Sequence, residues 1–372
     1  MRALLIIMLS WSCGGGRRPV PKTIATPTET PQAIVPQEEA SRAPGPWYTR
    51  QANWSPGNAI RAPGIHWAKK LDGPIVHPLS TDGSSIYAVA GGRVYCISKE
   101  GSLQWSSPIN ADGPPTLGGS GLYIPTALGV MQLLDPETGQ ILTSYGGQAP
   151  IHTALLVLEE SIVWMDAEGT LVSPDGPSST SVPGPIADAA SDGETLVVGN
   201  AEGKVFAVAD NIRWEQSLPG PAVHHPVIDK TVAFVPFSAA DGQPGGVVAV
   251  NIQSGATVWT TFLKFQPGGA PALGEHLIVP DKRSELVALD VNHGGIRWRA
   301  PGPAVFSIQP AIVGRAIYAG DTGGRLRRID SADGGTVWSI DLGAPITGEP
   351  VVIDGTVIVG TSDGRLIAVG EL

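Results

Sequence analysis

Several polar residues that precede a proline could do binding chemistry if the fold brings them together. His77 and His225 each stand directly before a proline in an apolar segment, as do Gln309 and Glu349 in theirs. His152 occupies a similar place. Imidazole, carboxamide and carboxylate groups converging at one point could bind a metal ion or an anion, although no spacing among them is specific to a metal. The alternative is that they form the polar lining of a wet channel.

No catalytic constellation is evident elsewhere in the sequence. It contains no Gly-rich phosphate loop with Lys and Ser or Thr, no nucleophile elbow, no Cys-x-x-Cys and no His-Glu-x-x-His. The two cysteines are Cys13 and Cys96, and Cys96 stands alone in an apolar segment typical of a buried strand. These observations predict a protein that is not an enzyme and that uses no cofactor.

Cys13 has the surroundings of a lipid attachment site. Arg2 is followed by the apolar run Ala3–Leu9, which is far shorter than the ~20 residues of a transmembrane helix. A positive start and a short apolar core are typical of a secretory signal peptide. Ser12 before the cysteine resembles the lipobox of bacterial lipoproteins, in which the cysteine is acylated and becomes the mature N-terminus. We therefore expect a signal peptide over residues 1–12 and a lipid on Cys13. A freely secreted or periplasmic protein is the alternative.

We expect residues 13–46 to form a disordered tether. The stretch after the cysteine is rich in Pro, Thr, Glu and Ala and has no aromatic residue, so it cannot bury enough surface to fold. A flexible chain of this length spans roughly 30 Å, which would hold a folded body clear of a membrane. By the sorting rule that the lipoprotein resemblance implies, Gly14 directs the protein to the outer membrane. The folded domain is expected over residues 47–372.

Composition and charge restrict the fold class and the partners. The chain has 48 Gly and 34 Pro, which break helices, while its β-branched residues favour strands. Lys and Arg number 24 against 34 Asp and Glu, a net charge of −10. A nucleic-acid binder needs a concentrated basic surface, and the pairs Lys69-Lys70 and Arg327-Arg328 are isolated and expected to be solvated. We predict an all-β, monomeric protein that binds no nucleic acid.

A repeat of about 40 residues is the strongest signal in the sequence. Six tryptophans each close an extended apolar segment: Trp67, Trp105, Trp214, Trp259, Trp298 and Trp338. Trp259 and Trp298 are 39 residues apart, and Trp298 and Trp338 are 40 apart. Tyr145, and then Ser181 or Val182, stand near the places where the repeat lacks a tryptophan. A period of this length in a Gly-rich, β-branched sequence indicates propeller blades.

The order of features inside each period predicts a four-stranded blade. A Gly-Pro or Ala-Pro dipeptide comes first, followed by three short apolar strands separated by Gly turns, and then by the strand that carries the tryptophan. Ser85–Ala90 and Arg93–Ser98 are examples of a second and a third strand. Eight segments carry the first three strands, but the last has no fourth strand and Trp67 has no three strands before it. We therefore predict an eight-bladed β-propeller of antiparallel blades, in which an N-terminal strand completes the C-terminal blade.

The turn before three of the tryptophans resembles the tryptophan-docking repeat of quinoprotein (PQQ) propellers. The same four-and-four spacing recurs in three triplets: Asp290, Gly294 and Trp298; Asp330, Gly334 and Trp338; Asn251, Gly255 and Trp259. The resemblance implies a quinoprotein alcohol dehydrogenase-like fold, in which the tryptophan of one blade packs on the turn of a neighbour. We thus expect the six tryptophans to be structural. Quinoprotein dehydrogenases also use a vicinal Cys-Cys pair, which the solitary Cys96 cannot form.

An exported lipoprotein with eight minimal blades resembles the propeller subunit of the outer-membrane β-barrel assembly machinery. This resemblance implies a non-catalytic protein–protein scaffold on the periplasmic side of the outer membrane. The alternative is a periplasmic propeller that binds a ligand or ion in its axial channel. We expect partners to bind loops at an end face, first at the insertion Ser238–Gly246 or at Pro46–Trp54. Trp47, Tyr48 and Trp54 either anchor a partner or cap the propeller's own edge.

Overall fold

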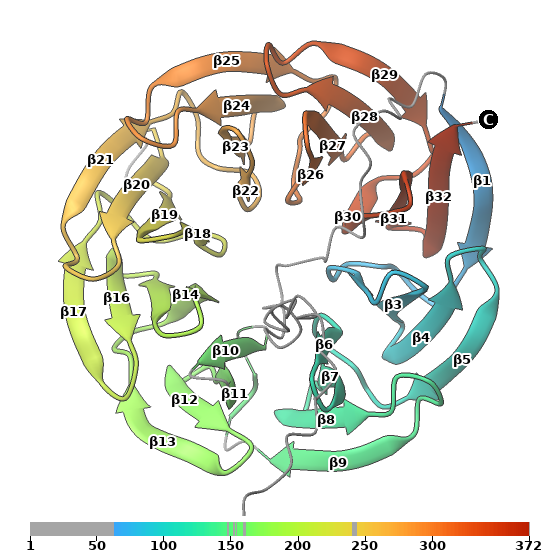
Figure 1. Cartoon of the computed structure of the whole chain (residues 1–372), viewed down its shortest axis with the longest axis horizontal. Coiled ribbons are helices and arrows are strands. Elements are labelled where there is room, and N and C mark those ends of the chain that lie inside the picture. Colours follow the sequence, from blue (N-terminus) through green and yellow to red (C-terminus); the bar gives the residue numbers. More distant parts are fainter. Residues whose placement is uncertain are drawn as a thin grey trace, which may run out of the picture. The chain divides into compact units, whose positions relative to one another are not determined.

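A computed structural model describes residues 63–146, 149–151, 153, 155–158, 161–239 and 244–371. Within these ranges, 32 strands form eight four-stranded antiparallel sheets around a common axis (Figure 1). The predicted eight-bladed all-β propeller is confirmed. This part of the chain contains no helix that is long and apolar enough to cross a membrane. The expected signal peptide, Cys13, the tether, the segment 46–54 and His152 lie outside the described residues.

In blades 1 to 4, the strands follow chain order from the axis outwards. Blade 1 contains β2 (Ser80–Thr81), β3 (Ser85–Ala90), β4 (Arg93–Ser98) and β5 (Leu103–Pro108). Blade 2 contains β6 (Thr116–Gly118), β7 (Gly121–Pro125), β8 (Val130–Leu134) and β9 (Ile141–Gly146). Blade 3 contains β10 (Leu156–Leu158), β11 (Ser161–Met165), β12 (Thr170–Ser173) and β13 (Gly176–Ser181). Blade 4 contains β14 (Ile186–Ser191), β15 (Leu196–Asn200), β16 (Lys204–Val208) and β17 (Ile212–Ser217).

Blades 5 to 7 repeat this order, and blade 8 takes its outer strand from the start of the described chain. Blade 5 contains β18 (Val227–Asp229), β19 (Val232–Phe237), β20 (Gly246–Asn251) and β21 (Thr257–Phe262). Blade 6 contains β22 (Ala272–Leu273), β23 (Leu277–Pro280), β24 (Glu285–Leu289) and β25 (Ile296–Pro301). Blade 7 contains β26 (Ala311–Val313), β27 (Ala316–Gly320), β28 (Arg325–Asp330) and β29 (Thr336–Asp341). Blade 8 contains β30 (Ile346–Ile353), β31 (Thr356–Thr361), β32 (Arg365–Glu371) and β1 (Pro63–Lys70).

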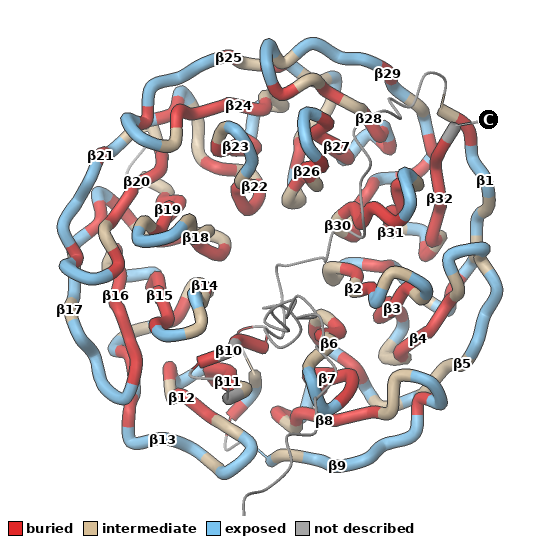
Figure 2. The backbone as a smooth tube through the Cα atoms, in the orientation of Figure 1, coloured by how far each residue is buried: buried red, intermediate tan, exposed pale blue. Residues whose placement is uncertain are grey.

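The strands in the middle of each blade are buried on both faces, because side chains alternate between the two neighbouring blades. In β3, Ile86 and Ala88 face blade 8, whereas Tyr87 and Val89 face blade 2. The outermost strands are mostly exposed, as the pale tube at the rim of Figure 2 shows. Central strands therefore read as continuous apolar runs in the sequence, and only the outer strands alternate.

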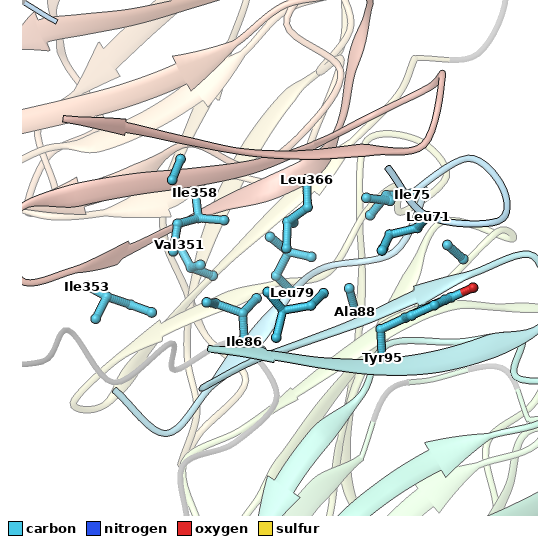
Figure 3. Packing of buried hydrophobic residues seen from close by; sticks show 13 residues of the cluster. Leu71, Ile75, Leu79, Ile86, Ala88, Tyr95, Val351, Ile353, Ile358 and Leu366 are labelled. Atoms are coloured by element: carbon cyan, nitrogen blue, oxygen red, sulfur yellow. The ribbon is translucent and has the colours of Figure 1, made fainter. Parts of the chain in front are cut away.

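Hydrophobic clusters join every pair of adjacent blades, so the described blades form a closed ring. The cluster between blades 8 and 1 contains Val351, Ile358 and Leu366 from one side and Leu79 and Ile86 from the other (Figure 3). Seven similar clusters lie between the other pairs. The innermost strands are short, down to two residues in β2 and β22. Each blade therefore narrows towards the axis.

The strand β1 pairs antiparallel with β32, from Lys70 opposite Arg365 to Pro63 opposite Glu371. The blade that contains the C-terminal strands is thus completed by the strand that carries Trp67. This pairing joins two segments that are about 300 residues apart in the sequence.

Candidate functional site

Five of the six repeat tryptophans hold the turn of the following blade. Their indole Nε1–H groups donate to main-chain carbonyls: Trp67 to Lys99 at 2.9 Å, Trp105 to Pro136 at 2.9 Å, Trp214 to Ile252 at 2.6 Å, Trp259 to Val291 at 3.0 Å and Trp298 to Ser331 at 2.7 Å. Trp338 is also buried, at 6% exposure, and its ring packs against Tyr318. The five hydrogen bonds link adjacent blades, whereas the contact of Trp338 with Tyr318 lies within blade 7.

The Asp and Gly of the repeat shape the turn that receives the indole. The Asp290 carboxylate accepts the N–H groups of Asn292 and His293, both at 2.9 Å, which closes the turn. Gly294 follows with φ +70°, and a Cβ on it would lie 2.6 Å from the Trp259 ring. Only glycine meets both demands, the left-handed backbone and the close approach of the ring. The four-and-four spacing therefore encodes one interaction between blades.

The two blades that lack a tryptophan on the outer strand, blades 2 and 3, make other contacts. Thr143, and not Tyr145, pairs at the position that the tryptophan takes elsewhere. Tyr145 instead packs between Tyr123 and Trp164, with ring centroids 6.4 Å apart in each pair. In blade 3, the hydroxyl of Thr180 donates to the carbonyl of Asp210 in blade 4 at 2.6 Å. Neither Ser181 nor Val182, which we expected near this place, makes that bond.

The basic pair in β28 is not solvated as expected. Arg327 is only 6% exposed, and its guanidinium lies 4.7 Å from the centre of the Phe306 ring. Its Nη1 donates to the carbonyl of Pro301 at 2.9 Å. The face of an aromatic ring attracts a cation, and this attraction offsets part of the cost of removing the guanidinium from water. The expectation was wrong for Arg327 because a sequence pair of charges does not show which face of the strand each residue occupies.

Truncating a docked tryptophan should destabilise the ring. We expect Trp298→Ala to lower the free energy of unfolding by about 3–5 kcal/mol, because it leaves a cavity against the next blade. Val337→Ala is the matched control, since Val337 lies on an outer strand and is 47% exposed. Denaturant unfolding compares the two. A loss with Trp298→Ala no larger than that of the control would refute the docking role.

Near the axis, polar residues from different blades meet one another. His225 precedes β18, and its Nδ1 lies 4.0 Å from Oδ2 of Asp188 in β14. The Gln309 carboxamide, from the segment before β26, donates to the carbonyl of Pro271 at 2.6 Å and hydrogen-bonds His225. The backbone N–H of Gln309 is close enough to the Glu349 carboxylate in β30 to oppose the rise of its pKa. One run of polar contacts thus links blades 4 to 8.

His77 belongs to a separate axial pair. Its Nε2 lies 3.8 Å from Oδ1 of Asp112, which joins blade 1 to blade 2. Across the seam between blades 8 and 1, the hydroxyl of Thr347 donates to the carbonyl of Ile75 at 2.6 Å. Of the axial residues expected from the sequence, the structure therefore brings His225, Gln309 and Glu349 together and places His77 elsewhere on the ring.

Asp188 is the axial residue that sequence reasoning missed. It follows Gly184-Pro185 at the same distance at which His77 follows Gly73-Pro74. It precedes an alanine, however, so a search for polar residues before proline passed over it. Alignment on the Gly-Pro dipeptide would have found this carboxylate.

The protein surroundings favour the neutral forms of the axial groups. Burial raises the pKa of Asp188 to about 7, against the opposing effect of the Ala189 N–H. Burial also raises the pKa of Glu349 to about 8; the Gln309 N–H opposes this rise and the Asp188 carboxylate adds to it. Burial and His224 lower the pKa of His225 to about 3, with Gln309 acting in the opposite sense. Asp188 and Glu349 can therefore change protonation state near neutral pH, whereas His225 stays neutral there.

The sign of the pH dependence follows from these shifts. A carboxyl group whose pKa is raised by folding stabilises the fold fully below its unfolded pKa, and this contribution is lost as pH rises through the folded pKa. We expect the free energy of unfolding to fall from pH 6.5 to about pH 8 and to level off by pH 9. Up to their folded pKa values, Asp188 and Glu349 stay protonated in the fold while they are ionised in the unfolded chain. The depressed pKa of His225 acts in the opposite sense, but only as pH falls below about 6.5.

The variant Asp188→Asn/Glu349→Gln isolates this effect. Its free energy of unfolding should fall less than that of the wild type between pH 6.5 and 9, measured by urea unfolding at each pH. Asp341→Asn, on the exposed end of β29, is the control and should leave the wild-type slope unchanged. An equal slope in the double variant and the wild type would show that these two carboxyls do not govern the dependence.

A cavity of about 660 Å³ lies between blades 1 and 2, lined mainly by polar residues: Asp82, Ser84, Ser85, Tyr87, Cys96, Gln104, Asp135, Pro136 and Glu137. Cys96 lies in β4 and is 2% exposed, and its burial raises the pKa of the thiol. The carboxylate of Asp82 accepts bonds from Ser84, Ser85 and Tyr87. Over the described ranges, no group of three His, Cys, Asp or Glu residues is arranged to hold a metal ion.

A cluster of cations surrounds Phe265 in the loop between β21 and β22. Lys264 Nζ lies 5.3 Å, and the Arg283 guanidinium 4.7 Å, from the centre of this half-buried ring. Lys282 Nζ donates to Gln266 Oε1 at 3.1 Å. The three cations are exposed, and none of them forms an ion pair with a described carboxylate. We call Lys264, Phe265, Lys282 and Arg283 the Phe265 patch.

The returning end of the expected insertion, residues 244–246, lies beside this patch. Leu263 N–H donates to the carbonyl of Gly245 at 2.8 Å, so the returning end of the insertion is bonded to the patch loop. A Cβ on Gly245 would lie 2.9 Å from the ring of Pro267 in the same loop. Gly245 therefore adjoins the Phe265 patch, while residues 240–243 of the insertion lie outside the described residues.

Known proteins share the repeat sequence and the propeller fold of this chain. The sequence profile of the family described as outer membrane protein assembly factor BamB matches residues 159–304 and 243–371, which together exceed half of the chain. No curated protein matches the sequence.

Solved structures of several kinds share the fold. The computationally designed Ika8 protein is similar with a TM-score of 0.71 and 14% identity, covering 82% of this chain and 98% of its own. BamB from Moraxella catarrhalis has a TM-score of 0.66 and 16% identity, covering 83% and 98%. Quinohemoprotein alcohol dehydrogenase from Comamonas testosteroni has a TM-score of 0.64 and 12% identity, covering 84% and 77%. At these identities the likeness establishes the propeller fold alone, whereas the profile match establishes descent. The chain belongs to the family described as outer membrane protein assembly factor BamB, built on a PQQ-like propeller.

Proposed function

We propose that this chain is a non-catalytic propeller lipoprotein that acts as a protein–protein interaction scaffold on the periplasmic side of the outer membrane, in the assembly of β-barrel proteins. The observation that carries the proposal is the profile match over residues 159–371, because the family it describes is an outer membrane assembly factor. The fold by itself also occurs in a dehydrogenase. Function therefore has to be argued from the chain's own surfaces.

The chemistry of the chain supports a role without catalysis. Dehydrogenases with this type of repeat use two adjacent cysteines over the quinone, and Cys96 is not followed or preceded by another cysteine. Its thiol is buried, and burial raises its pKa, so it is a poor nucleophile at neutral pH. The axial carboxyls of Asp188 and Glu349 lie next to residues of other blades, which supports a structural role in holding the blades together.

The Phe265 patch and the adjoining insertion supply a surface for a partner. Three unpaired cations stand out in a chain of net charge −10. Phe265 offers an aromatic anchor between two of them, and aromatic and Arg residues are enriched where binding energy concentrates. Loops that are fixed by a rigid ring are suited to recognition. We place the main partner contact at this surface.

The lipid anchor rests on the N-terminal sequence. Arg2, the run Ala3–Leu9 and Ser12 before Cys13 match the order of a lipoprotein signal. We expect Cys13→Ser to release the protein from membranes into the soluble fraction, measured by fractionation of cells that express each form. Cys96→Ser is the control and should remain with the membranes. Retention of Cys13→Ser on membranes would rule out the lipid as the anchor.

Crosslinking in living cells tests the scaffold role. Native membranes are isolated after crosslinking, and the proteins attached to the propeller are identified by mass spectrometry. We expect components of the barrel-assembly machinery with the wild type and a loss of about tenfold with Lys264→Glu/Arg283→Glu, since two charges at the interface are reversed. Lys69→Glu/Lys230→Glu carries the same change of charge away from the patch and should behave as the wild type. Recovery of no assembly component with the wild type would overturn the proposed function.

A further inference from the structure

The cations of the Phe265 patch differ from many others in the described chain, because they have no carboxylate partner. Eight Lys and Arg side chains elsewhere form ion pairs with Asp or Glu. Lys264, Lys282 and Arg283 are exposed and lie on two neighbouring loops. Like charges gathered in this way repel one another, and an anionic group placed among them relieves that repulsion. The patch therefore favours a ligand that carries negative charge.

The two loops that carry these cations are fixed to each other. The backbone N–H of Lys282 donates to the carbonyl of Gln266 at 2.9 Å, and its Nζ donates to Oε1 of the same residue at 3.1 Å. In the turn before β24, the Asp281 carboxylate accepts the N–H groups of Arg283 at 2.8 Å and Glu285 at 3.0 Å. A surface that is formed in advance loses little conformational entropy when a partner binds.

Arg283 and Lys264 are spaced to contact two carboxylates. The Arg283 guanidinium lies over the Phe265 ring, 4.7 Å from its centre, and Lys264 Nζ lies 5.3 Å from the same centre. The two cationic groups are therefore at most about 10 Å apart. A guanidinium that lies over a ring can still present its N–H edge to both oxygens of a carboxylate.

An exposed aromatic ring adjoins the cations. Phe262 is 55% exposed at the end of β21, three residues before Phe265. Its ring packs edge-on against buried Phe237, with centroids 5.6 Å apart, and it pairs opposite Gly246 on β20. Apolar contact at such a ring excludes water, which strengthens the charged contacts beside it.

We propose that the Phe265 patch binds an extended acidic segment of a partner protein, with two of its carboxylates on Arg283 and Lys264 and an apolar side chain on Phe262. Side chains two residues apart in a strand face the same side and are about 7 Å apart. Those three residues apart in a polyproline II segment also face one side, at about 9 Å. Both spacings fit within the limit set by the two cations.

This inference rests on the proposed scaffold function and specifies the chemistry of the partner. Charge complementarity favours a narrow protein segment as the occupant. A lipid surface would also meet the acidic remainder of a chain of net charge −10, whereas an extended segment can contact the patch alone.

Photocrosslinking in living cells tests this chemistry in the full chain. The photoreactive amino acid p-benzoylphenylalanine replaces Phe262, and mass spectrometry identifies the peptide that becomes attached. We expect a partner peptide with two carboxylates that are two or three residues apart. Leu142 is the matched control position, since it is 53% exposed on β9, three blades away, and should capture no such peptide.

Charge reversal then tests the contact itself. We expect Lys264→Glu/Arg283→Glu to lower the crosslinked yield about tenfold, and a change of the two mapped partner carboxylates to Lys to restore it to within about twofold of the wild type. Attachment to lipid, attachment to a peptide without paired carboxylates, or failure of the reversal to restore the yield would overturn the inference.

The outcomes separate this inference from the function on which it rests. If no protein attaches at position 262 while assembly components are still recovered with the membranes, the inference is wrong and the scaffold function stands with its contact elsewhere. If the wild type recovers no assembly component, the proposed function itself is contradicted.

Discussion

The ring exists because no blade can bury its own apolar surface. Each central strand points alternate side chains into the blade before it and the blade after it, as Ile86 and Tyr87 do in β3. A first or last blade with one bare face would expose an apolar sheet and an open edge, which invites association with other chains. Every blade therefore needs two neighbours, and the sheet series must close. The pairing of β1 with β32 meets this need, since it completes the blade that meets both ends of the described chain.

Because the ring is closed, packing constrains most residues of the blades, and the loops between strands are the sites where a partner can bind. Docked tryptophans and their glycine turns join five of the eight pairs of adjacent blades at the rim, while Asp188, His225, Gln309 and Glu349 link blades near the axis. The middle of the blade is closed to solvent on both faces. Variable chemistry is left to the connections between strands, where the insertion and the Phe265 patch lie. This division supports the proposed scaffold role.

Much of the fold could be predicted from the sequence because a repeat multiplies a weak signal. The expected strands Ser85–Ala90 and Arg93–Ser98 coincide with β3 and β4. The resemblance of the Asp, Gly and Trp spacing to the repeat of quinoprotein propellers implied a contact between neighbouring blades, and five tryptophans make it. The count of eight blades followed from the first three strands of each period and held in the two blades whose outer strand has no tryptophan.

The predictions failed at residues whose contacts depend on the tertiary structure and not on the repeat pattern. Thr180 makes the bond of a missing tryptophan through a hydroxyl, which no spacing would indicate. Trp164 is fully buried in β11, outside the repeat position, because blade 3 fills its core differently. Arg327 is buried by stacking on Phe306, and Asp188 lacks the proline that marked its counterparts. Each case depends on a contact between segments far apart in the chain, so local sequence could not reveal it.

Ring closure is the claim on which the rest depends, and native-state hydrogen exchange measured by mass spectrometry tests it most directly. If β1 is an integral strand of blade 8, peptides that cover Pro63–Lys70 will exchange as slowly as those that cover the outer strand Ile296–Pro301 of blade 6. Rapid exchange over Pro63–Lys70, with slow exchange retained over Ile296–Pro301, would contradict the account. It would mean that the ring holds together without the strand that was taken to close it.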